Sequence, residues 1–294
     1  MKASIKDKIL LLLGGVFLFI LIGLLFYDVT RKGIFSKEIG LNIAVIGDSE
    51  VNVLLLRPEE GVVEWIKLPN NIKTKIYNSD ARYPIISLWN YGVSEKNPFE
   101  ILEKSLGQSM GIIIAKTIKL NDGSLIETVL GKLYQLSLIT DLSIRDRILI
   151  RNFLADAINS KKILEYSVPE MAFDRVIDPD GKEFLEFNQL VNLWTKNKFV
   201  IEAILNENAD ISINNVSGVA GKGNILANQL ESTGMHVIEL KADANEQIEG
   251  QGCLFNTQKN FKTTEIVLND LLKCTKIPAP SFVENKEGIS VWIK

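Results

Sequence analysis

The sequence predicts an α/β or α+β protein, and three observations support that fold class. Short apolar runs typical of strands come first, at 41–46, 51–56 and 61–68, and glycine and proline turns separate them. Segments with apolar residues at helical spacing follow. A strand, a glycine loop, a helix and a further strand then succeed one another near the C-terminal end. Strands that precede helices predict sheets covered by helices.

Composition excludes several classes of protein. The 294 residues carry 33 basic and 36 acidic groups, and 46% of them are hydrophobic. This balance excludes a disordered chain and a basic nucleic-acid binder, so we expect no nucleic-acid partner. Two cysteines and one histidine cannot form a four-ligand zinc site without carboxylates.

An uncharged segment at 9–27 predicts a single N-terminal transmembrane helix, because about 20 apolar residues span a bilayer. We expect a cytoplasmic tip at 1–8, the anchor at 9–27 and a linker at 28–40. The cell membrane is then a partner, and the bulk of the chain lies outside the cytoplasm. A cleaved signal peptide and a buried core helix are the alternatives.

The first predicted domain covers 41–205. Asn97, Pro98 and Glu100 give the start signals of a helix that Gly107 can end. The remaining elements are predicted as a buried strand at 111–120 and helices at 125–138, 144–158 and 184–205, the last with a break near Asn197.

The second predicted domain covers 209–294 and is small and of βαβ type. Its elements are predicted as strands at 210–214, 235–240, 253–256 and 289–293, and helices at 224–232 and 263–274.

A glycine loop at 218–223 joins the first strand of this domain to its first helix. Gly218, Gly221 and Gly223 are spaced in the reverse order of the dinucleotide-binding fingerprint. A Walker-type phosphate loop is excluded as well, because a glycine and a hydroxyl are missing where it needs them. Together with Asn214, Lys222 and the helix N-terminus, the loop could hold an anion. Tight backbone geometry is the alternative reason for these glycines.

Cys253 begins a predicted strand and Cys274 ends the helix that follows it, so both lie at one edge of the domain. This placement allows a disulfide, which an oxidising compartment would favour. Two buried thiols are the alternative.

The C-terminal region resembles the LytR C-terminal domain, over nearly all of 209–294. The residues in step with that pattern are Asn214, Gly218, Val219, Gly221, Ala227, Leu230, Gly234 and Val237. The stretch Asn215-Val216-Ser217 and the run Gly221-Lys222-Gly223 depart from it.

The region before it is similar to the catalytic domain of LytR-CpsA-Psr (LCP) proteins. The opening LNIAVIGDSEV and the later Ile66-Lys67-Leu68-Pro69 carry this likeness. Asn70 and Asn71 stand where the family has an arginine and an aspartate. Ser49 stands where a magnesium-binding aspartate is expected, between Asp48 and Glu50.

The resemblance implies a bacterial cell-envelope protein that faces the cell wall. LCP enzymes are similar to phosphotransferases that move a glycopolymer from polyprenyl pyrophosphate to peptidoglycan with magnesium. Because asparagine supplies no charge to offset pyrophosphate, we predict a noncatalytic protein without a cofactor or bound metal. It would bind or scaffold peptidoglycan, a cell-wall glycopolymer, a polyprenyl-linked lipid or a protein partner.

Two alternatives remain. The first is an active magnesium-dependent phosphotransferase whose charged groups have moved to neighbouring positions. Its candidate residues are Asp48, Glu50, Arg57, Arg82 and Arg151. The second is a regulator that binds a nucleotide or anion at the glycine loop.

Overall fold

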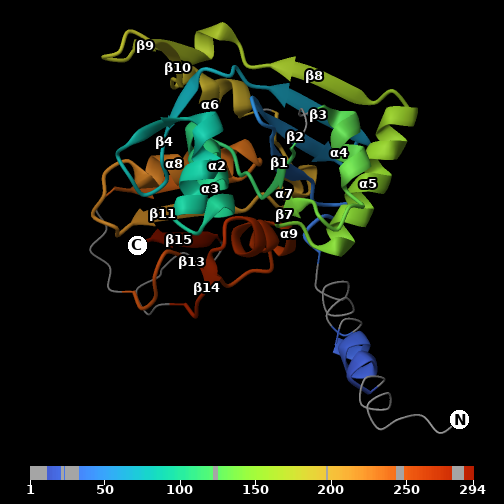
Figure 1. The fold of residues 1–294 in the computed structure, drawn as a ribbon. Helices are drawn as coiled ribbons and strands as arrows, with labels where there is room; N and C mark the ends of the chain where they lie inside the picture. Colours follow the sequence, from blue (N-terminus) through green and yellow to red (C-terminus); the bar gives the residue numbers. More distant parts are fainter. Residues whose placement is uncertain are drawn as a thin grey trace, which may run out of the picture.

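The computed structural model describes residues 12–20, 23, 33–121, 125–196, 198–242, 248–279 and 288–294. These residues form a mixed α/β fold with three sheets, shown in Figure 1. The orders of the strands are β7-β6-β1-β2-β3-β8, β5-β4-β10-β9 and β12-β11-β15-β13-β14.

The six-stranded sheet is built on the early strands that the sequence predicts. These are β1 (Leu41–Ile46), β2 (Val51–Arg57) and β3 (Val62–Lys67), paired antiparallel in that order. Every residue of β1 and β2 is buried, as expected for central strands covered on both faces. The sheet is completed by β6 (Lys116–Lys119), β7 (Ile139–Thr140) and β8 (Ile163–Ser167).

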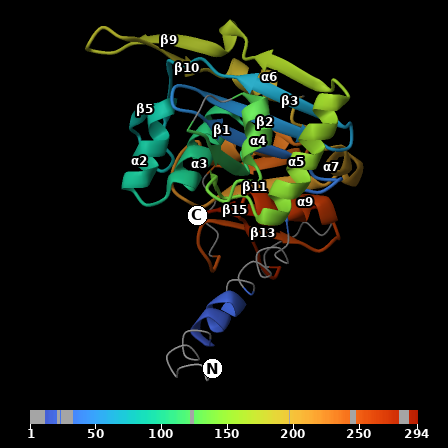
Figure 2. The same ribbon diagram turned by 45° about the vertical axis from the view of Figure 1, so that its right-hand side comes forward.

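Helices cover both faces of this sheet, as Figure 2 shows. On one face lie α2 (Leu88–Ser94), α3 (Pro98–Met110) and α6 (Leu190–Thr195), which pack on Ala44, Val53 and Leu55. On the other face lie α4 (Ile126–Lys132) and α5 (Ile144–Asn159), which pack with Ile43 and Leu54. The 3-10 turn η1 (Ile85–Ser87) leads into α2.

Several predicted bounds in this region were wrong. Helix α3 continues past Gly107 and ends at Gly111, which has the left-handed conformation with φ 65°. The side chain of Asn97 bonds Glu100 instead of capping the helix backbone. The predicted strand at 111–120 is shortened to β6, and the predicted helix at 125–138 is shortened to α4.

The predicted long helix at 184–205 was also wrong. The structure forms β10 (Glu183–Phe187), α6 and α7 (Glu202–Glu207) there, and the expected break at Asn197 lies outside the described residues. Strand β10 joins a four-stranded sheet with β4 (Ile72–Lys75), β5 (Arg82–Pro84) and β9 (Phe173–Ile177). The short turn η2 (Glu170–Ala172) precedes β9.

The C-terminal region contains the predicted β-loop-α-β unit. It consists of β11 (Asp210–Asn215), α8 (Lys222–Ser232) and β12 (His236–Lys241), with β11 and β12 parallel. The five-stranded sheet also contains β13 (Cys253–Thr257), β14 (Thr275–Lys276) and β15 (Ile289–Ile293). Between β13 and β14 lie α9 (Lys262–Ile266) and the π-helical turn η3 (Val267–Leu271).

One buried cluster runs through both halves of the chain. It joins Ile43 and Leu54 of the six-stranded sheet with Ile213, Leu230 and Val291 of the C-terminal region. The two halves therefore pack against each other through a shared hydrophobic core, and the surface between them positions the cleft described below.

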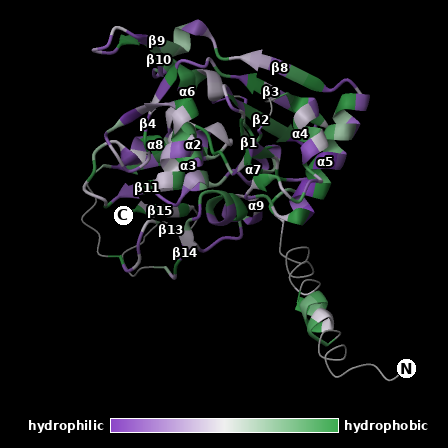
Figure 3. Ribbon diagram, viewed as in Figure 1, coloured by the Kyte–Doolittle hydropathy of each residue, from purple (hydrophilic) through white to green (hydrophobic). Residues whose placement is uncertain are grey.

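The predicted transmembrane helix at 9–27 was wrong for the part of the chain that the structure describes. Residues 12–20 form an apolar helical stretch, green in Figure 3. Among the described residues, however, no helix combines the length and the hydropathy needed to cross a bilayer. The expected tip at 1–8 and the remainder of the range, except Gly23, lie outside the described residues, as do linker residues 28–32.

Candidate binding cleft

The candidate phosphotransferase residues lie on different elements, and each has its own partner within the fold. Asp48 and Glu50 lie in the turn before β2, whereas Arg57 ends that strand, roughly 20 Å away at about 3.3 Å per residue. The Asp48 carboxylate is paired with the Lys119 ammonium at 3.1 Å. A Glu50 carboxylate oxygen accepts a hydrogen bond from the Asn52 amide at 3.3 Å.

The other two candidate arginines have separate partners. Arg82 in β5 pairs with Glu186 in β10 on the four-stranded sheet. Arg151 on α5 stacks over the ring of Tyr134 at 4.0 Å.

Arg57 is held by contacts with the segment that follows α6. Its guanidinium donates to the main-chain oxygen of Lys198 and lies 5.6 Å from the centre of the Phe199 ring. Burial lowers the pKa of Arg57, and the nearby Glu64 opposes that change. Burial in turn raises the pKa of Glu64, which Arg57 opposes. The two groups offset each other's charge within the fold.

The residues around the β1–β2 turn do not fit a magnesium ion. Within the described ranges, no three His, Cys, Asp or Glu side chains gather closely enough to hold a metal. Asp48 is paired with Lys119, and Ser49 replaces the expected acidic ligand. Asn70 and Asn71 lie exposed in the turn after β3. A doubly charged pyrophosphate with magnesium therefore finds no matching set of charges here.

Two glycines of the loop have a backbone reason, and the third lies close to a side chain. Gly218 and Gly221 have φ values of 69° and 84°, which disfavour any residue with a Cβ atom. A Cβ at Gly223 would lie 2.9 Å from a methyl carbon of Leu240. The structural alternative thus accounts for these three positions.

Asn215, which sequence reasoning did not select, orders this loop. Its amide nitrogen donates to the Val219 oxygen at 2.9 Å, and its amide oxygen accepts from Ser217. Its position at the end of a strand and before a glycine loop could have indicated this role, because an asparagine side chain commonly forms a hydrogen bond with the backbone two residues later. The amide oxygen of the predicted Asn214 is buried and has no hydrogen bond within the part of the chain described.

Lys222 lines a cleft of about 780 Å³ between the two halves of the chain. One wall comes from the segment 75–80 and from α3, and the other from the glycine loop, the start of α8 and the end of β15. The volume lies within the usual range for ligand sites, roughly 300 to 1,000 Å³.

The cleft is basic. Its charged side chains are Lys75, Lys104, Lys222, Lys294 and Asp80. Asp80 pairs with Lys75 at 2.6 Å at the exposed rim. Lys222 forms no ion pair with another residue in the described ranges. The remaining positive charge therefore favours an anionic ligand.

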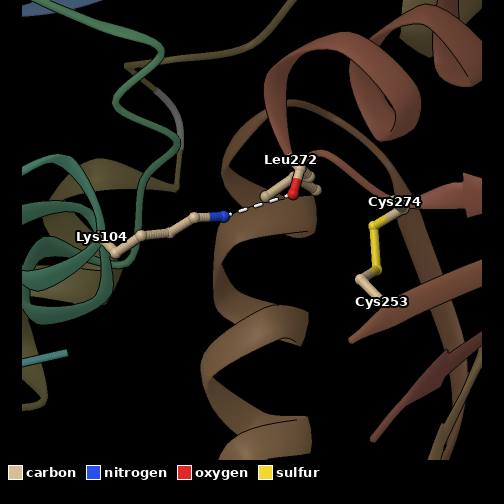
Figure 4. The surroundings of a disulfide bond; sticks show 4 residues. All are labelled: Lys104, Cys253, Leu272 and Cys274. Carbon is tan, nitrogen blue, oxygen red and sulfur yellow. Dashed lines mark hydrogen bonds between the residues drawn. A yellow bond between two sulfur atoms is a disulfide. The ribbon is translucent and has the colours of Figure 1, made fainter. Parts of the chain in front are cut away.

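Lys104 extends from α3 toward Leu272 in the C-terminal region, as Figure 4 shows. Its Nζ donates to the main-chain oxygen of Leu272 at 3.3 Å. Burial lowers the pKa of Lys104, and Lys273 acts in the same direction, while Glu100 and Glu103 oppose the change. A bound anion would favour the charged form and raise this pKa again.

Cys253 and Cys274 also line the cleft, joined by a disulfide with an S–S distance of 1.95 Å. Their Cα atoms lie 4.5 Å apart. The bond connects the start of β13 to the chain just after Leu272, so it fixes the segment that accepts the hydrogen bond from Lys104 (Figure 4).

No model of a known protein family matches the sequence, and no curated protein matches it. Among solved structures, the chain is similar to TagV of Bacillus subtilis with a TM-score of 0.41 and 10% identity, over 53% of this chain and 94% of TagV. TagT of B. subtilis gives 0.39 and 11%, over 54% and 89%. A transcriptional regulator from Enterococcus faecalis gives 0.40 and 12%, over 52% and 83%.

A further similar structure is TagT bound to LI-WTA. TM-scores and identities this low assign neither a family nor an activity to this chain. The resemblance to LCP proteins and to the LytR C-terminal domain stays a prediction from the sequence.

Proposed function

We propose that this protein is a noncatalytic binding protein of the bacterial cell envelope, and that its basic cleft holds an anionic polymer such as a phosphate-bearing cell-wall glycopolymer. The observation that carries this proposal is the cleft between the two halves, with Lys104, Lys222 and Lys294 along its walls. A concave basic surface attracts polyanions at long range and holds them by charge-assisted hydrogen bonds.

The protein is proposed to be noncatalytic because its candidate phosphotransferase groups have separate partners within the fold. Phosphoryl transfer depends on positioned cations around the reacting phosphate. Here Arg82 and Arg151 are engaged on different elements, and Asp48 is paired with Lys119. No observation favours the active phosphotransferase over the binding protein.

The disulfide supports a location outside the cytoplasm, since such bonds persist in oxidising compartments. The glycopolymer, rather than a nucleotide, is proposed because the glycine loop is explained by its backbone geometry and lacks the fingerprints of nucleotide-binding loops.

A titration of the full chain with poly(glycerol phosphate) tests the proposal. We expect saturable binding that weakens as salt rises. Lys222→Ala should raise the Kd roughly tenfold, the effect of losing one charge-assisted hydrogen bond. Lys262→Ala, an exposed lysine on α9 outside the cleft, is the matched control. Equal losses in both variants, or no binding, would overturn the cleft as the binding site.

A second assay tests the absence of catalysis. The chain is incubated with a short-chain polyprenyl pyrophosphate and magnesium, and released phosphate is measured. We expect no release above the buffer blank. Turnover that persists in purified protein would replace the binding function with the phosphotransferase.

A further inference from the structure

The basic cleft adjoins a second groove of different chemistry. Gln108 on α3 and Ile225 on α8 line both, and the second groove has a volume of about 610 Å³. Its further polar lining includes Gln189, Asn192 and Asn228, and it contains no lysine or arginine. The lining thus carries several lysines on one side of Gln108, in the basic cleft, and several side-chain amides on the other side, in the second groove.

Four of the five side-chain amides that line this groove are not used within the fold. The side chains of Gln108, Gln189, Asn192 and Asn228 form no hydrogen bond with any other described residue. They come from α3, α6 and α8, so they converge from separate elements on one concave surface. A side-chain amide presents two donors and an acceptor, which matches the paired donor and acceptor character of sugar hydroxyls.

Asn188 holds one wall of the groove in place. Its amide nitrogen donates to the Met171 oxygen and to the Asp174 carboxylate, both at 3.0 Å. Its amide oxygen accepts from the Leu190 backbone at 2.9 Å. These bonds fix the turn between β10 and α6, and they place Gln189 beside the groove. Preorganised polar groups lower the cost of ordering on binding.

Apolar side chains complete the lining. Phe187 packs on Phe173 with ring centroids 5.1 Å apart, which orders its ring at the groove. Leu190 and Ile225 add aliphatic surface. A pyranose ring has carbon-bound hydrogens on its faces and hydroxyls at its rim, and this mixture of apolar and amide surface complements both parts.

We propose that the amide-rich groove binds an uncharged saccharide unit. The inference rests on the proposed function in one respect: the sugar is taken to belong to the same ligand whose anionic part lies in the basic cleft. For the groove alone we predict that it binds a neutral oligosaccharide, and that the Kd of this binding does not depend on salt concentration.

The test titrates the full chain with maltotetraose and with N-acetylglucosamine tetramer, by calorimetry in low and in 0.5 M salt. We expect at least one neutral tetramer to bind, with a Kd that changes less than twofold with salt. Asn228→Ala and Asn192→Ala should each weaken that binding at least fivefold. Asn224→Ala, an exposed asparagine on the same helix α8 and outside both grooves, should leave it unchanged.

The outcomes separate this inference from the proposed function. If poly(glycerol phosphate) binds through Lys222 and neither tetramer binds, the inference is overturned and the proposed function stands. If a tetramer binds and Lys222→Ala leaves its Kd unchanged, while Asn228→Ala weakens it, the inference is supported. Sugar binding that survives both asparagine substitutions places the sugar elsewhere and also overturns it. Thermal melting of each variant checks that it remains folded.

Discussion

The amide nitrogen of Gln229 on α8 donates a hydrogen bond of 2.8 Å to the main-chain oxygen of Ile112, which lies 117 residues earlier in the chain. Gln229 is 6% exposed and Ile112 is fully buried. The bond fastens the C-terminal region to the segment after α3, next to both grooves. It therefore links the packing of the two halves to the geometry of the candidate site.

Gln229→Leu should destabilise the whole protein. The substitution keeps apolar volume but leaves the buried Ile112 oxygen without a donor, which costs about 1–3 kcal/mol in free energy of unfolding. Urea unfolding followed by circular dichroism measures this loss. Gln258→Leu, at an exposed loop position, is the control and should change stability by less than about 0.5 kcal/mol. Equal stability of the two variants would show that the bond does not join the halves.

Gly107→Ala should also destabilise the fold, although alanine is the better helix former. A Cβ there would lie 2.8 Å from the Ile112 oxygen and 3.3 Å from the Gln229 amide nitrogen, so the backbone must shift. We expect a loss of about 1–3 kcal/mol from overpacking. Gly131→Ala on α4 is the matched control, since nothing lies within 4 Å of its Cβ. That variant should gain up to about 1 kcal/mol. A gain in both would contradict the close approach of α3 and the segment after it.

Sequence patterns predicted the secondary structure correctly where the local hydrophobic pattern agrees with the burial of the segment in the fold. The largely apolar run at 41–46 becomes β1, because such a strand fits the middle of a sheet covered on both faces. At 210–214, Ile211 and Ile213 alternate with polar residues, and this segment becomes most of β11. The helix predicted at 144–158 from its apolar spacing forms as α5, and the structure adds that the Ser143 side chain caps its N-terminus.

Sequence patterns failed to predict the secondary structure where strands pair with partners far away in the sequence. Phe184 and Leu185 fit helical spacing as well as a strand, and the choice is made by Leu185 pairing with Ile72 of β4, far away in the sequence. The cleft shows the same limit. Lys222 was marked by its glycine loop, but Lys104 and Lys294 join it only through tertiary packing, so no local pattern predicts the basic cleft.

Glu103→Gln should raise stability at neutral and alkaline pH. Burial, reinforced by Asp141, raises the pKa of Glu103 to about 9, while the Thr117 hydroxyl donates to it at 3.0 Å. The unfolded carboxyl ionises near its ordinary value of 4.5, whereas the folded one keeps its proton. The unfolded state therefore binds fewer protons, and this group lowers stability as pH rises from about 4.5 to about 9.

The neutral glutamine removes that pH dependence and keeps the hydrogen bond to Thr117. Its advantage over the natural protein should grow with pH by up to about 1.4 kcal/mol per unit between those limits. Urea unfolding at several pH values measures the difference. Glu127→Gln, an exposed position on α4, controls for the loss of a carboxylate. A constant difference between Glu103→Gln and the natural protein across this range would contradict a protonated Glu103.

The bond between Cys253 and Cys274 should survive purification and contribute to stability. Denatured, unreduced protein treated with iodoacetamide should show no added mass, and reduced protein should show two labels. Reduction frees a loop across 21 positions, and the resulting gain in chain entropy should lower the free energy of unfolding by roughly 3 kcal/mol. The double variant Cys253→Ser with Cys274→Ser is the control, because a dithiol reductant should not change its unfolding curve. Two labels without reduction would establish free thiols, and the disulfide would then no longer support a location outside the cytoplasm.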